Sequence, residues 1–113
     1  MVILKNSQGN EGRRMRLEIL VASPPTTKCQ HIISSMEAFV AKYPEQLRLD
    51  IYYAGMQLTI KPTRGYQVEG KLKKVPSVFV NGICVANGEV PDFDEAARVM
   101  ESELSKGPQS WEK

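Results

Sequence analysis

One short stretch, Lys74 to Gly82 (KVPSVFVNG), constrains the fold more than any other part of this 113-residue sequence. Pro76 precedes an apolar run, Val78 to Val80, which ends in Asn81-Gly82. A strand accepts proline only at its first residue, at an edge or at a bulge. Asn-Gly between apolar runs signals a two-residue β-turn, because both turn positions take positive φ. The stretch therefore predicts a hairpin in which Val78 to Val80 pairs antiparallel with Ile83 to Val85.

Two more strands and two helices follow from the hydrophobic pattern. Leu17 to Val21 is apolar except at Glu18, which indicates a central strand covered on both faces. Apolar residues recur at helical spacing from Cys29 to Tyr43 and indicate an amphipathic helix that ends at Pro44. Leu47 to Tyr53 predicts a second strand, parallel to the first. A capping box at Asp92 begins the last helix.

Residues 54–74 do not read clearly as any element. Gly55, Pro62, Gly65 and Gly70 interrupt them, so at most two helical turns are expected, within residues 54–60. A connection of this length without regular structure is unusual in a compact domain and is often functional. We expect a degenerate helix or an irregular loop.

Composition bounds the function classes. A net charge of +2, with 42% hydrophobic and 25% charged residues, is ordinary for one soluble domain and gives no reason to expect nucleic acid as a partner. No apolar run approaches the roughly 20 residues that span a bilayer, and no signal peptide is recognisable, so we expect no membrane and a cytoplasmic location. Two cysteines and one histidine form neither a disulfide framework nor a zinc pattern. We expect no metal and no cofactor.

The chain divides into three parts. Residues 1–14 read as a flexible leader, 15–105 as the domain and 106–113 as a polar tail. Arg13, Arg14 and Arg16 are interpreted as a solvated basic stretch, with an anion-binding patch as the alternative. Trp111 in the tail either folds back on the domain or anchors a partner.

The stretch Val75-Pro76-Ser77-Val78-Phe79-Val80-Asn81-Gly82, together with the order of elements over residues 15–105, resembles the thioredoxin superfamily, closest to the glutaredoxin type. The resemblance implies a minimal thioredoxin-like α/β fold: a four-stranded mixed sheet in the order 2-1-3-4 with two or three packing helices. It also implies that Pro76 is cis and faces the start of the first helix, near Cys29.

Proteins of this family carry Cys-x-x-Cys at that helix start, and here only Cys29 is present. If Cys29 takes the second position, which the loop length favours, Thr26 takes the first; in the other frame Ile32 takes the second. A threonine hydroxyl cannot exchange disulfides but is a good N-cap. Cys29 is either a low-pKa thiol at a helix start or a small buried core residue. His31 points to another side of the helix and reads as a surface residue.

Several basic residues precede Pro76. They are set against one acid, Glu69, and we expect them to surround Pro76 beside Lys28; they are Lys61, Arg64, Lys71, Lys73 and Lys74. Such a rim would attract a carboxylate from a peptide C-terminus or glutathione, and the alternative is a solvated face. The Gly-Gly-x-Asp stretch with which glutaredoxins hold glutathione is missing at residues 86–89 (ANGE).

These observations leave two main hypotheses. In the first, Cys29 is the catalytic thiol of at most a monothiol oxidoreductase, with Thr26 and Pro76 beside it, exchanging with a peptide or a thiol-containing protein. In the alternative, the chain is a non-catalytic module that binds a peptide next to Lys28, Lys74 and Val75. A third possibility is association through the hairpin edge strand. Cys84 lies near the hairpin turn, too far from Cys29 for a disulfide, and reads as a filler of the core or edge.

Overall fold

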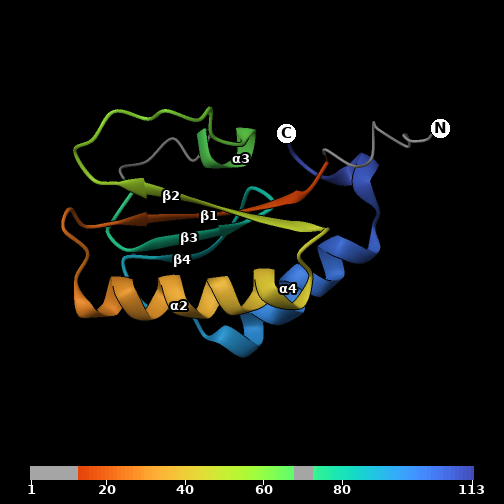
Figure 1. Cartoon of the computed structure of the whole chain (residues 1–113), viewed down its shortest axis with the longest axis horizontal. Helices are drawn as coiled ribbons and strands as arrows, with labels where there is room; N and C mark the ends of the chain where they lie inside the picture. The colour runs from red at the N-terminus through yellow and green to blue at the C-terminus, as the bar shows by residue number, and fades with distance from the viewer. Residues whose placement is uncertain (1–12, 68–72) are drawn as a thin grey trace.

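The described residues, 13–67 and 73–113 of a computed structural model, form a sheet with helices on both sides. The elements are β1 (Met15–Val21), α2 (Thr27–Lys42), β2 (Leu47–Tyr53), α3 (Arg64–Gln67), β3 (Ser77–Val80), β4 (Ile83–Asn87), α4 (Phe93–Ser105) and η2 (Pro108–Ser110). The strand order is β2-β1-β3-β4 (Figure 1). β1 pairs parallel with β2 and antiparallel with β3. The predicted α/β fold class and strand order are confirmed.

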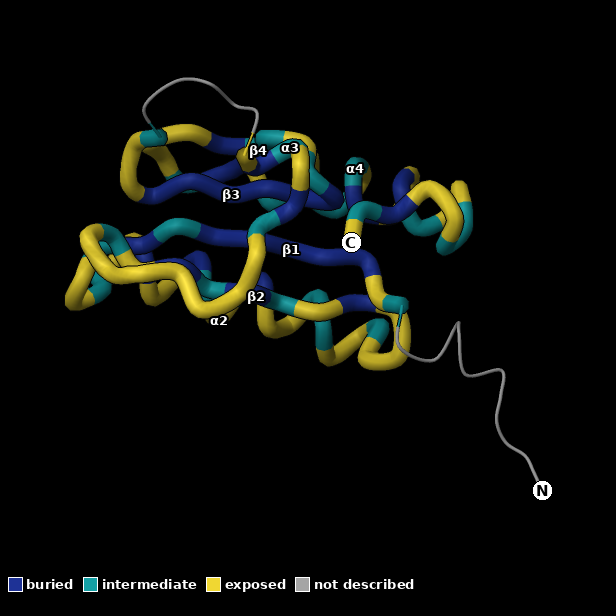
Figure 2. Tube along the Cα trace, turned by 90° about the horizontal axis from the view of Figure 1, so that it is seen from above, coloured by how far each residue is buried: buried dark blue, intermediate teal, exposed yellow. Residues whose placement is uncertain are grey.

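Two layers of different character cover the sheet. Helices α2 and α4 lie on one face, and α3 with the chain leading to it lies on the other (Figure 1). Side chains of β1 alternate between the faces: Leu17 and Ile19 join the core cluster that includes Ile32 and Met36 of α2, whereas Glu18 points to the opposite side. Burial is greatest along β1 and β3 in the middle (Figure 2). The central strand is therefore covered on both faces, as predicted.

A buried polar network fastens the irregular segment to the sheet. The Glu18 carboxylate is fully buried and accepts hydrogen bonds from Tyr52 Oη (2.6 Å), Thr63 N (2.9 Å) and Thr63 Oγ1 (2.5 Å). Arg16 supplies the positive charge, with its Nη2 3.8 Å from Glu18 and its Nε 2.9 Å from Asp50. Breaking such a buried pair would leave a charge without compensation. Burial, followed by the negative charge of Glu18, raises the pKa of Tyr66 to about 12.

The described part of residues 54–74 is irregular apart from one short helix, as expected. Residues 54–60 form turns and bends, and the helical turn comes later, at Arg64–Gln67. Thr63 explains the shift, because its hydroxyl accepts from Tyr66 N (3.2 Å) while it also bonds Glu18. The helix start is thus fixed by a contact to β1 rather than by local propensity.

The hairpin turns at Asn81 (φ 49°) and Gly82 (φ 79°), as predicted. Its register is only partly as expected, since Val78 pairs with Ala86 and not with Val85. The irregularity between Val78 and Phe79 leaves Val85 as an extra residue in β4, which is a β-bulge.

The C-terminal tail folds back on the domain. Trp111 is only 6% exposed, and its Nε1 donates to the Glu103 carbonyl (3.1 Å). Glu112 N donates to Asn81 Oδ1 (2.7 Å) at the hairpin turn. Beside this contact α3 meets the turn so closely that a Cβ at Gly65 would overlap the Gly82 carbonyl oxygen. The tail is therefore part of the packed structure.

The interpretation of Arg16 as a solvated tail residue is wrong. β1 begins at Met15, so Arg16 lies inside the strand and is only 4% exposed. Arg13 donates to the Pro108 carbonyl (3.1 Å), while Arg14 is exposed. The charge of Arg16 is tolerated because Asp50 and Glu18 lie on the same face of the sheet.

Candidate functional site

Cys29 lies in the first turn of α2, immediately behind the helix cap. Thr26 is the N-cap, as predicted: its Oγ1 accepts from Cys29 N (3.2 Å) and donates to Cys29 Sγ (3.2 Å). A second donor, Ala22 N, reaches the sulfur from the end of β1 (3.4 Å). The side chain is 0% exposed and belongs to the core cluster that includes Ile32 and Met36, so the thiol is a buried core group.

Two opposing effects act on this thiol. Burial raises the pKa of Cys29, but hydrogen bonds from the Thr26 side chain and the Ala22 backbone lower it, and the net pKa lies below the usual value. The start of α2 carries no acidic residue in its first turn, which also favours a negative charge there. The site is electrostatically suited to a thiolate although the sulfur has no exposed surface.

An open cavity of about 620 Å³ lies in front of the helix start. It is lined by residues from the β1–α2 loop, the first turn of α2 and the approach to β3: Ala22, Thr26, Thr27, Lys28, Val75, Pro76 and Gly88. The Val75–Pro76 peptide bond is cis, in agreement with the resemblance. The structure therefore brings Thr26, Lys28, Val75 and Pro76 together around one cavity, with Cys29 behind Thr26 and not in the lining.

The backbone at Val75, beside this cavity, makes no hydrogen bond to a described residue. The Pro76 carbonyl already accepts from Gly88 N (2.6 Å), and proline has no N–H to donate. Val75 is 39% exposed, and no described residue hydrogen-bonds to its backbone. The peptide group of Val75 is therefore open to a partner as far as the described residues go.

The basic segment does not gather at Pro76. Lys61 and Arg64 line a different cavity, at the other end of the sheet, so that part of the prediction is wrong. The Thr63–Glu18 bonds hold both residues beside the start of β1. Lys71 and Glu69 lie outside the described residues.

The two lysines nearest Pro76 are placed differently from each other. The Lys73 ammonium lies 4.4 Å from the centroid of the Tyr66 ring. Lys74 lies against Gly88, and its backbone N donates to Asn87 Oδ1 (2.9 Å). Lys74 is thus adjacent to the cavity without lining it, and Lys28 is the cation that does.

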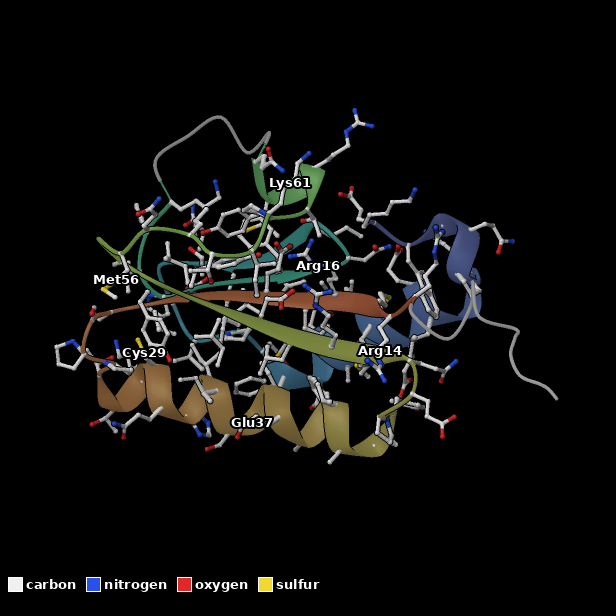
Figure 3. All side chains as sticks on the ribbon, turned by 45° about the horizontal axis from the view of Figure 1, so that its top comes forward. Arg14, Arg16, Cys29, Glu37, Met56 and Lys61 are labelled. Atoms are coloured by element: carbon white, nitrogen blue, oxygen red, sulfur yellow. The ribbon has the colours of Figure 1, made fainter. Side chains whose placement is uncertain are left out.

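Sequence reasoning missed an apolar strip beside the cavity. Tyr53, Met56 and Leu58 are exposed and line a groove of about 460 Å³ that shares Val75 with the cavity at Pro76. Figure 3 shows Cys29 and Met56 at the same end of the molecule, with Arg16 further along the sheet. The sequence did contain a sign of this strip: residues 56, 58 and 60 are apolar, although their segment lacks the periodicity of a helix that would bury them.

The remaining candidates take no part in this site. Cys84 packs on the opposite face of the sheet near Phe79, and Cys29 is a free thiol. His31 is exposed and makes an edge contact with the Phe93 ring (centroids 5.4 Å apart). Among residues 13–67 and 73–113 there is no group of three or more His, Cys, Asp or Glu residues that could hold a metal ion.

No family model, curated protein or solved structure matches the chain. The helices in the part of the chain that the structure describes are too short or too polar to cross a membrane.

Proposed function

We propose that the chain is a non-catalytic binding module on a thioredoxin-like scaffold, and that the cavity beside Pro76 receives an extended peptide segment. The observation that carries this proposal is the enclosure of Cys29. Its sulfur has no exposed surface, and Thr26 stands between it and the open cavity. A hydroxyl at that position cannot attack a disulfide.

The geometry suits a peptide in three respects. The open backbone of Val75 can pair with an extended chain, as in other cases of strand addition. The apolar groove along Tyr53, Met56 and Leu58 continues from Val75 and can take apolar side chains. Lys28, at the start of α2, can pair with a carboxylate. The proposed partner is therefore a segment with apolar residues next to an acidic side chain or a C-terminus.

A second candidate function rests on the donors that point at the sulfur. Thr26 and Ala22 both hydrogen-bond to Cys29 Sγ and favour its thiolate. If Thr26 moved aside, that thiolate could attack a partner disulfide. An S–S bond to Cys29 would form, the partner's S–S bond would break, and the partner's second sulfur would leave as a thiolate. This is monothiol exchange, and without a resolving cysteine it ends at the mixed disulfide.

The rate of Cys29 alkylation against pH separates the two functions. The protein carries Cys84→Ser so that only one thiol reports. Binding without catalysis predicts labelling that is slow until the protein unfolds. Fast labelling with a midpoint well below the free-cysteine pKa of about 8.5 would instead support monothiol exchange.

Peptide binding is tested by selection from a random peptide library displayed on phage. Recovered peptides are expected to carry a carboxylate beside apolar residues and to lose affinity for Lys28→Glu. Lys42→Glu, at the opposite end of α2, makes the same charge change away from the cavity and should leave binding intact. Equal losses for the two variants, or failure to enrich any peptide, would contradict the proposal.

A further inference from the structure

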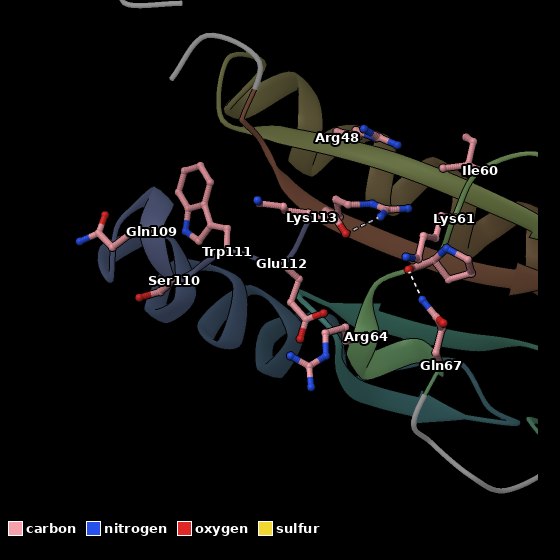
Figure 4. A pocket seen from close by; sticks show the side chains of 12 residues that line it. Arg48, Ile60, Lys61, Arg64, Gln67, Gln109, Ser110, Trp111, Glu112 and Lys113 are labelled. Atoms are coloured by element: carbon pink, nitrogen blue, oxygen red, sulfur yellow. Dashed lines mark hydrogen bonds between the residues drawn. The ribbon is translucent and has the colours of Figure 1, made fainter. Parts of the chain in front are cut away.

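A second cavity, of about 640 Å³, lies beside the start of β1. Its walls come from β1, β2, the chain around α3 and the C-terminal tail (Figure 4). The lining side chains that matter here are basic or apolar: Arg16, Arg48, Lys61, Arg64, Ile60 and Trp111. Arg16 belongs to β1 near its start, whereas Ala22 of the Pro76 cavity directly follows its end. The six residue steps from Arg16 to Ala22 correspond to roughly 20 Å of strand, so the two cavities are separate.

The positive charges of this cavity are only partly used within the protein. Arg16 is committed to the structure, because its guanidinium bonds Asp50 (2.9 Å), Tyr52 Oη (3.1 Å) and the Lys113 carbonyl (2.9 Å). Arg48 uses its Nε on Asp50 (3.1 Å) and is bonded through no other nitrogen to a described residue.

Lys61 and Arg64 form no ion pair with any described residue. Among the described residues that line the cavity only Glu112 has an acidic side chain, and its Oε1 accepts from Gly65 N (3.2 Å). Three cations therefore border one space from two segments, Arg48 from β2 and Lys61 and Arg64 from the chain around α3, and only Arg48 is ion-paired with a described residue. Like charges held in this way repel each other, and an anion placed between them gains from all three.

We infer that this cavity binds a small organic molecule that carries two or more negative charges, as phosphate or carboxylate groups. Arginine guanidinium groups form bidentate hydrogen bonds with both kinds of anion. Ile60 and Trp111 supply an apolar wall next to the charges, so the ligand has an apolar part as well as its anionic groups. The volume falls within the range of small-molecule sites, about 300–1,000 Å³.

The walls are held in place without a ligand. Thr63 ties the segment that carries Lys61 and Arg64 to buried Glu18, and Trp111 is fixed through the Glu103 carbonyl. Asp50 orients both Arg16 and Arg48. A site with preformed walls spends little binding free energy on ordering its backbone, so the ordering cost falls on the exposed side chains of Lys61 and Arg64.

The test is a titration followed by tryptophan fluorescence and by calorimetry. Trp111 is the only tryptophan in the sequence and lines the cavity, so its emission reports directly on occupancy. The probes are pyrophosphate and citrate at constant ionic strength. Saturable binding of pyrophosphate alone indicates a phosphate ligand, and saturable binding of citrate alone indicates a polycarboxylate. Binding of both indicates that the site selects its ligand by charge and size rather than by the kind of anionic group.

The double variant Lys61→Gln/Arg64→Gln is expected to weaken the binding of the probe at least about tenfold. The control, Lys42→Gln/Arg98→Gln, removes the same charge from exposed positions on α2 and α4, and should bind like the unaltered protein. The inference is overturned if neither probe saturates below about 10 mM, or if both double variants lose affinity equally. Neither outcome bears on the peptide site at Pro76, because no residue of that cavity is changed.

Discussion

Replacing Thr63 by valine is expected to destabilise the protein by about 2–4 kcal/mol, although Thr63 lies in a segment with little regular structure. The substitution keeps the size and shape of the side chain and removes only its hydroxyl. That hydroxyl donates to the fully buried carboxylate of Glu18 (2.5 Å) and accepts from Tyr66 N (3.2 Å). The variant therefore leaves a buried charge with one donor fewer and a buried N–H without an acceptor.

The magnitude follows from those two losses. A hydrogen bond to a charged group contributes about 1.5–3 kcal/mol, and an unsatisfied buried donor costs about 1–3 kcal/mol. Tyr52 Oη and Thr63 N remain bonded to Glu18, which keeps the total below the sum of the upper values.

Urea unfolding followed by circular dichroism measures the effect, with Thr63→Ser as the matched control. Serine keeps the hydroxyl and loses one methyl group, for which about 1 kcal/mol is expected. Amide hydrogen exchange at Tyr66 provides a local readout and should become faster only in the valine variant. The reasoning is refuted if Thr63→Val costs less than about 0.5 kcal/mol, or no more than Thr63→Ser.

Trp111→Ala should lower the free energy of unfolding by about 3–5 kcal/mol, because it leaves a cavity where a buried side chain was, and Trp111→Phe should lower it clearly less. If Trp111→Ala unfolded at the same urea concentration as the unaltered protein, the tail would add no stability. Gly65→Ala should lower the free energy of unfolding by about 1–3 kcal/mol or more, because the new methyl group meets the Gly82 backbone. An unchanged melting temperature would show that the two segments are not in contact. In a Cys84→Ser background, the stability of the protein relative to its Cys29→Ala variant should rise with pH. The pKa of Cys29 is lower in the folded state, so its contribution is complete above the unfolded pKa of about 8.5 and is lost as pH falls through the folded pKa; a constant difference across that range would contradict it.

Local signals in the sequence predicted those features that depend on neighbouring residues. Asn81-Gly82 predicted the turn, and Thr26 predicted the start of α2, because both act within a few residues. The bulge at Val85 was not predictable in this way, since register depends on how a whole strand packs.

The irregular segment, residues 54–74, shows most clearly what could not be predicted from the sequence. Its course is decided by Thr63 and Glu18, which are far apart in the sequence, and no pattern within residues 54–74 points to that bond. Lys61 and Arg64 were wrongly predicted to lie beside Pro76 for the same reason, because the Thr63–Glu18 contact that positions them is not visible in the sequence. The burial of Arg16 was likewise decided by a partner on another strand, Asp50 of β2.

Four of the residues named as site candidates from the sequence lie together in the structure. Thr26, Lys28, Val75 and Pro76 do line one cavity, because the strand order brings the end of β1 next to the start of β3. Whether Cys29 was open to solvent could not be read from the sequence, since its burial depends on how α2 packs against the sheet. The structure answers that question with a buried thiol.

The close approach of α3 to the hairpin turn also restricts how the sequence can drift. Gly65 has no room for a methyl group against Gly82, and Gly82 holds a positive φ with Gly65 Cα and the Glu112 carboxyl group about it. Gly65 is thus tied to glycine by the Gly82 backbone, whereas Gly82 is tied first by the positive φ of the turn. A descendant of this chain that replaced Gly65 would have to move α3, and with it the cationic wall of the second cavity. In a set of related sequences, loss of glycine at position 65 should mark members in which that wall has shifted.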